Sequence, residues 1–391
     1  MQTIIERLLA NGVKIPHPHS VEIGVEVDPQ RIRPAVIHSG CRIFGANTLI
    51  EEGAKLGFEG PVTVNNCYVG PNVELNGGYF EGAVLLKGVK AGLGAHVRPG
   101  TIMEEYSSIA HTVGLKQTIL FPWVTLGSLI NFCDCFMSGG TSRKNHSEVG
   151  SSYIHFNYTP SQHKATPSLL GDVPRGVMLN QPPIFLGGQG GMVGPCRLNF
   201  GITTAAGIIV RKNELNPDRL IFGSGNMPRT SASYQKKHAK SAINKQLVTS
   251  NLIYIANLAA LRNWYRHVRG LFVGPHFSAE LHKGLCLTLE NAITERIKRL
   301  KEYTAFYIQT DFASQWAALE ELFCKQDAAY VCDGLLNKFV TRLEEAKTAG
   351  ADYLTAIQNL PADAAAQGTM WLQAIVDNTA KQALELFPEQ Q

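Results

Sequence analysis

The chain has 391 residues, enough for two or three domains, and its 45% hydrophobic and 17% charged residues are typical of a globular protein. A net charge of +4 is too small to require a nucleic-acid partner, and we expect none. The eight cysteines lack the spacing of a disulfide framework, which favours reduced thiols in a cytoplasm.

The chain begins with an amphipathic stretch, residues 1–14, which we expect to form a short helix. Pro16 and Pro18 end it, so residues 1–19 make a first segment. The stretch has no basic leader, long apolar run or small-residue cleavage site, so we expect no signal peptide. No run of about 20 apolar residues follows anywhere, so we also expect no transmembrane helix and no membrane partner.

Residues 20–227 are rich in Gly, Val, Ile and Asn and poor in helical patterning. An aliphatic residue followed by glycine recurs through this segment, as in Leu56-Gly57, Leu126-Gly127 and Leu186-Gly187. Short coils with an inward aliphatic residue and a turn glycine are typical of a parallel β-helix, in which stacked coils share one core. The spacings are often not multiples of six, so we expect loops between coils, notably at 138–146, 159–167 and 180–183. The alternative is a Gly-rich β-sandwich.

The composition changes near residue 227, where Ala, Leu, Lys and Glu replace glycine and β-branched residues. Leucine and isoleucine at every fourth position from Leu281 to Ile297 form one apolar stripe of a helix, with Ser278 as its N-cap. We therefore predict an all-α region over 228–391. Its basic clusters, at 236–240, 262–269 and 296–301, could bind phosphate, but a solvated helix surface balanced by glutamates is the favoured interpretation.

From Arg98 to Gly207 the chain resembles the acetyltransferase half of the bifunctional N-acetylglucosamine-1-phosphate uridyltransferase / glucosamine-1-phosphate acetyltransferase family. The resemblance covers about a third of the chain. The matching residues are Arg98-Pro99-Gly100, Lys116, Leu120, Gly127, Leu129, Asp134, Ile154, Asn157-Tyr158, Lys164, Leu170-Gly171-Asp172 and Ala205-Ala206-Gly207. The Arg-Pro-Gly followed by a lysine, and the Asn-Tyr pair, are the specific parts of this pattern.

The resemblance implies a left-handed hexapeptide-repeat β-helix that forms a homotrimer, with sites between neighbouring prisms. It implies that Arg98 and Lys116 bind a sugar phosphate, which agrees with the affinity of an arginine fork and a lysine for a dianion. By the same resemblance Asn157 and Tyr158 line the sugar and acetyl site, and Lys164 lies near another family lysine. Acetyl-CoA is then a cosubstrate contacted through the backbone at Gly188 and Ala206.

Several positions depart from the family pattern. The catalytic histidine falls on Ser128, a substrate-binding tyrosine on Asn131, and an asparagine on Glu148. A serine is no general base near neutral pH unless another group activates it. The nucleotidyltransferase half is absent, because residues 1–90 carry no Gly-rich nucleotide loop and are predicted to form coils. We therefore reject uridylyl transfer as an activity.

Another residue could supply the base. His155 lies two residues before Asn157, and if Ile154 points inward then His155 points outward, where Glu148 could orient it. His111, five residues before Lys116, is a second candidate. For both, the alternative is an ordinary surface histidine. Cys133-Asp134-Cys135 is the only close cysteine pair, and we expect no metal site there.

Two functions remain open. One is an acyltransferase of UDP-N-acetylglucosamine metabolism, which N-acetylates a phosphorylated or nucleotide-linked amino sugar. The catalytic candidates are then His155 and Ser128. The other is a catalytically inactive protein of the same fold that binds a sugar phosphate or serves as a scaffold, which the missing histidine favours.

Overall fold

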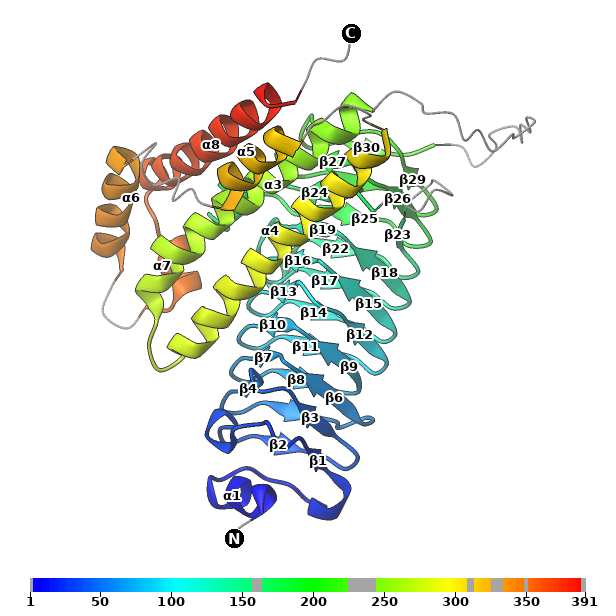
Figure 1. The fold of residues 1–391 in the computed structure, drawn as a ribbon, viewed down its shortest axis with the longest axis vertical. Coiled ribbons are helices and arrows are strands. Elements are labelled where there is room, and N and C mark those ends of the chain that lie inside the picture. Colours follow the sequence, from blue (N-terminus) through cyan, green and yellow to red (C-terminus); the bar gives the residue numbers. More distant parts are fainter. Residues whose placement is uncertain are drawn as a thin grey trace, which may run out of the picture.

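The computed structural model describes residues 3–156, 164–223, 244–307, 313–324, 333–347 and 351–387. Short parallel strands wind into a long solenoid, and the longer helices lie along one side of it (Figure 1). The predicted β-helix followed by a helical region is therefore confirmed. The β-sandwich alternative is excluded because the three large sheets of the described chain are all parallel.

The strands of the solenoid belong to three sheets, one for each side of a triangular coil. Sheet A contains β2 (Val36–Ile37), β5 (Lys55–Leu56), β8 (Glu74–Leu75), β11 (Lys90–Ala91), β14 (Ser108–Ile109), β17 (Thr125–Leu126), β22 (Glu148–Val149), β25 (Phe185–Leu186), β28 (Thr203–Thr204) and β30 (Leu220–Ile221). Sheet B contains β1 (Glu22–Ile23), β3 (Arg42–Phe44), β6 (Val62–Asn65), β9 (Gly78–Glu81), β12 (Ala95–Val97), β15 (Val113–Lys116), β18 (Ile130–Cys133), β23 (Ile154–Phe156), β26 (Gly191–Val193) and β29 (Ile209–Val210). Sheet C contains β4 (Leu49–Ile50), β7 (Tyr68–Val69), β10 (Ala83–Leu85), β13 (Thr101–Met103), β16 (Ile119–Leu120), β19 (Cys135–Met137), β24 (Ser168–Leu170) and β27 (Arg197–Leu198).

The strand register explains the irregular spacing of the aliphatic-glycine pairs. His96 pairs with Gly114, eighteen residues further on, which is six residues for each side of a coil. Two later coils carry the largest insertions: Leu126 pairs with Val149, and Val149 with Leu186. The added residues include a hairpin of β20 (Gly140–Ser142) and β21 (Asn145–His146) and the short helix α2 (Val173–Gly176), whereas 157–163 lie outside the described residues.

The corner between sheets A and B has the same backbone conformation in successive coils. One residue of each corner adopts a positive φ: Gly94 (78°), Thr112 (58°), Leu129 (60°) and Ser152 (64°). Glycine adopts this conformation without steric cost, but the solenoid also imposes it on other residues. Glycine therefore marks only some of the corners.

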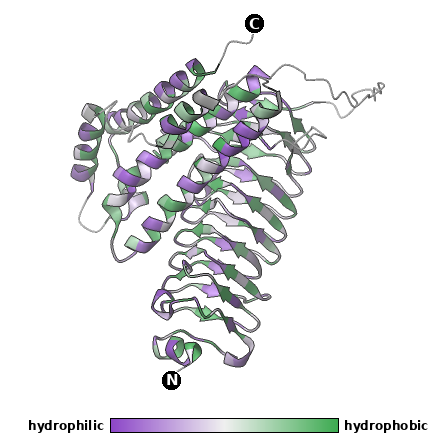
Figure 2. Ribbon diagram, viewed as in Figure 1, coloured by the Kyte–Doolittle hydropathy of each residue, from purple (hydrophilic) through white to green (hydrophobic). Residues whose placement is uncertain are grey.

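Sheet C differs from the other two sheets because both of its faces are buried. Every residue of β10, β13, β19 and β24 is buried, whereas most strands of sheets A and B alternate between buried and accessible residues. Figure 2 shows apolar residues along the strands of the solenoid as well as on the helices. The helices cover sheet C, so the solenoid and the helices share one hydrophobic core.

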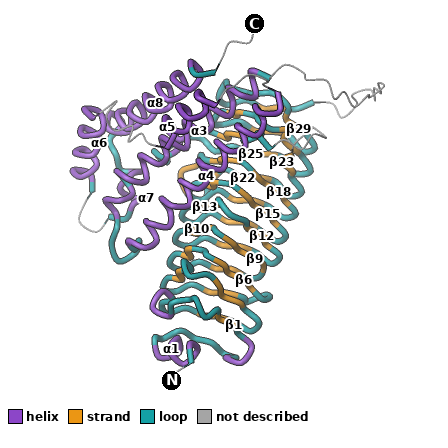
Figure 3. The backbone as a smooth tube through the Cα atoms, in the orientation of Figure 1, coloured by secondary structure: helices purple, strands orange, loops and turns teal. Residues whose placement is uncertain are grey.

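The helical layer begins after residue 243 in the described chain. Figure 3 shows its long helices beside the solenoid and the short helix α1 at the opposite end. The remaining helices are α1 (Ile4–Ala10), α3 (Lys245–His267), α4 (Ala279–Tyr307), α5 (Ala313–Cys324), α6 (Asp333–Ala346), α7 (Tyr353–Gln358) and α8 (Ala362–Glu385), with 3-10 turns at Pro18–Ser20, Pro29–Arg31 and Arg269–Phe272. Ser278 Oγ accepts a hydrogen bond from Leu281 N (3.1 Å), as predicted for the N-cap of α4.

Ion pairs fix the helical layer at both edges of sheet C. Arg296 of α4 pairs with Asp134 (2.8 Å) at the corner between sheets B and C. Arg269, after α3, pairs with Glu105 (2.5 Å) at the corner between sheets C and A. Beside it, Tyr265 donates a hydrogen bond to Glu104 (2.6 Å).

The prediction for the basic clusters was partly wrong. Arg266 pairs with Glu290 and Arg299 with Glu295, as a balanced helix surface requires. However, Arg262, Arg269 and Arg296 are buried instead of facing solvent. Arg269 and Arg296 pair with carboxylates of the solenoid, and Arg262 pairs with Glu290 within the helical layer. The cluster at 236–240 lies outside the described residues. None of the described helices is long and apolar enough to cross a membrane.

Candidate functional site

The residues predicted to bind phosphate lie side by side on the open outer face of sheet B. Arg98 N donates to Leu115 O (2.9 Å), which places Arg98 beside Lys116, and Lys116 is paired in register with Cys133. Val97, Leu115 and Phe132 point into the core. The side chains of Arg98, Lys116 and Cys133 therefore form an outward column at the end of the strands. We call the outward residues His96, Arg98, Gly114, Lys116, Asn131 and Cys133 the sheet B patch.

A chain of hydrogen bonds crosses the sheet B patch. Arg98 Nη2 donates to Cys133 Sγ (3.2 Å), and Cys133 Sγ donates to Asn131 Oδ1 (3.3 Å). Burial raises the pKa of the Cys133 thiol, and the nearby Arg98 opposes that rise. The sulfur is therefore a protonated thiol that orients Arg98 over the face and is a poor nucleophile.

The centre of the sheet B patch is shallow. Gly114 pairs in register with Asn131, and a β-carbon added to Gly114 would make only ordinary contacts, the nearest with the Asn131 amide oxygen at 3.4 Å. Gly114 carries no side chain, so the sheet is flat between the cationic column and the opposite corner of the strand. A ligand could therefore lie flat across the sheet, with an amide available for hydrogen bonding.

The helical layer contributes charge next to the cationic column. Asp134 follows Cys133, and its carboxylate pairs with Arg296 of α4. Burial raises the pKa of Asp134, while Arg296 and then Lys116 act in the opposite direction. Because Arg296 satisfies Asp134, Lys116 keeps its charge available to a bound anion.

A second group of predicted residues lines the corner between sheets A and B. Ser128 Oγ lies 2.8 Å from His111 Nδ1, on the preceding coil. Ser128 N donates to Ser151 Oγ (3.1 Å) on the following coil. Gly188 and Ala206 occupy the same corner two and three coils beyond Ser128, where Gly207 N donates to Gly188 O (2.9 Å). The predicted acetyl-CoA contacts and Ser128 therefore share one edge of the solenoid.

The predicted orientation of His155 was wrong. Ile154 is the outward residue, with 46% of its surface exposed, and His155 is only 3% exposed. His155 Nε2 lies 2.9 Å from Ser168 Oγ inside the solenoid, and burial lowers the pKa of its imidazole to about 4. Glu148 cannot orient it, because Glu148 points out from sheet A towards His146 (3.8 Å). The buried imidazole does not reach the sheet B patch, which removes the structural argument for His155 as a base.

Two predicted substrate ligands, Asn157 and Tyr158, lie outside the described residues. Lys164 is exposed and lies four residues before β24 of sheet C. Within the described ranges, no three His, Cys, Asp or Glu residues are grouped so that they could hold a metal ion. His111 was a candidate from the sequence, but its location could not be predicted, because its hydrogen-bond partner Ser128 lies on the next coil.

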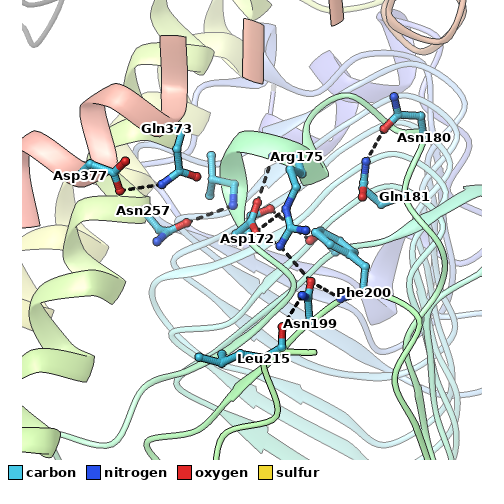
Figure 4. A network of polar contacts seen from close by, with 12 residues as sticks. Asp172, Arg175, Asn180, Gln181, Asn199, Phe200, Leu215, Asn257, Gln373 and Asp377 are labelled. Carbon is cyan, nitrogen blue, oxygen red and sulfur yellow. Dashed lines mark hydrogen bonds and ion pairs between the residues drawn. The ribbon is translucent and has the colours of Figure 1, made fainter. Parts of the chain in front are cut away.

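A cavity of about 720 Å³ lies elsewhere, between β27, α3 and α8. Figure 4 shows the polar contacts around it: Arg175 reaches both Asp172 and Asn199, and Gln373 donates to Asp377 (2.7 Å). Asn257 of α3 accepts from Val173 N (3.1 Å). The cavity contains none of the residues predicted for the site. Its residues come from segments far apart in the chain, so sequence spacing gave no signal for it.

Comparison with known proteins gives distant relatives. No protein-family model matches the chain. Three relatives, each named "Bifunctional protein GlmU", are 26% identical to it. They come from Nocardia farcinica (237 residues, 60% of this chain and 42% of the relative), Pelobacter propionicus (209 residues, 53% and 40%) and Pseudomonas putida (201 residues, 51% and 39%). The match thus covers about half of this chain and about two fifths of these relatives, and it supports the family resemblance.

Proposed function

We propose that the chain transfers an acetyl group from acetyl-CoA to the amine of a phosphorylated or nucleotide-linked amino sugar bound on the sheet B patch. The observation that carries this proposal is the outward column of Arg98 and Lys116 beside the open floor at Gly114. A guanidinium and an ammonium at one spot suit a phosphate dianion. The family resemblance implies this reaction, and the relatives named "Bifunctional protein GlmU" and the parallel solenoid support that resemblance.

The acceptor and the donor would approach from two sides. Ser128 lies at the corner before β18 and Cys133 ends that strand, so their five-residue separation spans at most about 16 Å at roughly 3.3 Å per residue. With its phosphate on Arg98 and Lys116, an amino sugar would extend across Gly114 and Asn131 towards Ser128. Acetyl-CoA would lie along the corner at Gly188 and Ala206, so its thioester would meet the amine near Ser128. Asn157, Tyr158 and Lys164 remain proposed ligands.

Binding of glucosamine 1-phosphate, measured by titration calorimetry, tests the phosphate site. Arg98→Ala should weaken binding by about 1.5–3 kcal/mol, the usual contribution of hydrogen bonds to charged groups. Arg42→Ala is the matched control. Arg42 is also an outward arginine of sheet B, but it lies three coils before Arg98 and pairs with Glu22. Equal affinities of the Arg98→Ala variant and the wild type would remove Arg98 from the site.

A binding protein without chemistry is the second candidate, and the burial of His155 favours it. Release of thiol from acetyl-CoA in the presence of glucosamine 1-phosphate separates the two functions. Thiol release that depends on the sugar supports acetyl transfer. Tight binding of the sugar without thiol release supports the binding protein.

A further inference from the structure

The corner between sheets A and B holds a serine and a histidine in direct contact. Ser128 Oγ and His111 Nδ1 are 2.8 Å apart, the distance of a good hydrogen bond between a hydroxyl and an imidazole nitrogen. Leu129 N donates to His111 O (3.1 Å) and Ser128 N donates to Ser151 Oγ (3.1 Å). These bonds to both neighbouring coils fix the two side chains relative to each other.

The location of the pair is as informative as its geometry. His111 is exposed and Ser128 is partly exposed, whereas His155 is enclosed in the core. The pair stands at the beginning of the strands β15 and β18, whose other ends carry Lys116 and Cys133. It also adjoins the edge that leads to Gly188. The pair therefore lies where the corner proposed to bind acetyl-CoA meets the sheet B patch.

We infer that Ser128 and His111 act together as a proton relay for acetyl transfer, an inference that rests on the proposed function. As the acceptor nitrogen attacks the thioester carbonyl, Ser128 Oγ takes one proton from that nitrogen and passes its own proton to His111 Nδ1. The carbon–sulfur bond then breaks, and the leaving thiolate recovers a proton from the imidazolium through Ser128. Atoms and charge balance, and no further reactant is needed.

The chemistry explains why both residues are required. A serine hydroxyl alone is too weak a base near neutral pH, and an imidazole can accept its proton. In the proposed arrangement Ser128 faces the acceptor amine, and His111 lies one coil away from it. Ser128 is therefore the group that contacts the substrate, and His111 acts through it.

The test is steady-state acetyl transfer by the full chain, with acetyl-CoA and glucosamine 1-phosphate. His111→Ala and Ser128→Ala should each lower kcat by about 10²- to 10⁴-fold, the usual contribution of general base catalysis, with little change in KM. Imidazole added to the buffer should restore part of the activity of His111→Ala. His38→Ala is the control, because His38 lies outside the site and its ring contacts Phe58.

A second variant keeps the inference independent of folding defects. Ser128→His places an imidazole directly at the corner, so in the His111→Ala background it should raise kcat at least tenfold. If His111→Ala keeps wild-type kcat, the relay is wrong and acetyl transfer stands. If the wild type gives no transfer, the proposed function and the relay both fail, whether or not Ser128→His gains activity.

Discussion

The buried ring of His155 makes folding depend on pH. Its pKa is lowered from 6.5 to about 4 because burial disfavours the charged imidazolium. The unfolded chain therefore binds more protons than the folded chain between these two values. The stabilisation is complete above about pH 6.5 and is lost as the pH falls towards 4. At about 1.4 kcal/mol per pKa unit, the loss amounts to about 3 kcal/mol.

Urea unfolding of the wild type and of His155→Gln at several pH values between 7 and 4 measures this loss. The difference in unfolding free energy between the two proteins should shrink by about 3 kcal/mol across the window. Using the difference matters, because burial raises the pKa of Glu104 to about 7, which acts on the total stability in the opposite direction. A difference that stays constant with pH would contradict the buried, neutral state of His155.

At the scale of single residues, the sequence predicted which residues lie together better than it predicted the direction in which a side chain points. Arg98 and Lys116 were expected to bind the same sugar phosphate, and the structure places them side by side on one outer face. The direction of His155 was wrong because a solenoid strand is only two to four residues long. If the inward position is assigned one residue too early or too late, every side chain of the strand is placed on the opposite face. The contact between His111 and Ser128 could not be predicted from the sequence. The number of residues in each coil decides which corner residues are stacked, and the coils differ in length.

At the scale of elements, the docking of α3 depends on a buried ion pair. Arg269 is 1% exposed, pairs with Glu105 and lies 3.9 Å above the ring of Tyr353. Replacing it by methionine leaves Glu105 buried without a counter-ion. Loss of one partner from a buried pair typically costs about 3–5 kcal/mol. We therefore expect Arg269→Met to lower the free energy of unfolding by that amount.

The matched control for this prediction is Arg342→Met. Arg342 pairs with Glu345 and Asp363 on the exposed surface of the helical layer, where such pairs contribute little. Urea unfolding of both variants gives the comparison. The second substitution Glu105→Gln, added to Arg269→Met, should recover part of the loss because it removes the unpaired charge. Similar stabilities of Arg269→Met and Arg342→Met would show that the pair does not hold the layer.

The sequence contained an unused signal for this docking. The strands Ala83–Leu85 and Cys135–Met137 are unbroken apolar runs, and both belong to sheet C. Continuous apolar strands are typical of sheets that are covered on both faces, whereas alternating strands have one open face. The helices and the solenoid were each predicted from periodicity. Their contact was not, because local periodicity does not record which face a distant helix covers.

At the scale of the whole molecule, the helical layer limits how copies of the chain can associate. Sheet C is covered, so the faces open to another copy are those of sheets A and B. Several large apolar side chains are exposed along the corner between those sheets or beside it: Leu93, Leu129, Ile154, Phe185 and Ile209. Exposed apolar side chains grouped along one edge are typical of an interface. The edge also carries Ser128, so neighbouring copies would enclose the proposed site.

The homotrimer implied by the resemblance therefore stays a prediction, with a specific interface. Light scattering should give about three times the 42.7 kDa of one chain. The double substitution Leu129→Glu and Ile154→Glu places two carboxylates on the exposed apolar edge, where burial against another copy would be costly. It should shift the mass to that of one chain, with helical circular dichroism unchanged.

Phe58→Glu is the control, since Phe58 is 75% exposed but lies in the early coils. A wild type of single-chain mass would disprove the trimer, and a double variant of unchanged mass would place the contact on another surface. Loss of sugar-dependent thiol release together with the trimer would further indicate that neighbouring copies complete the site.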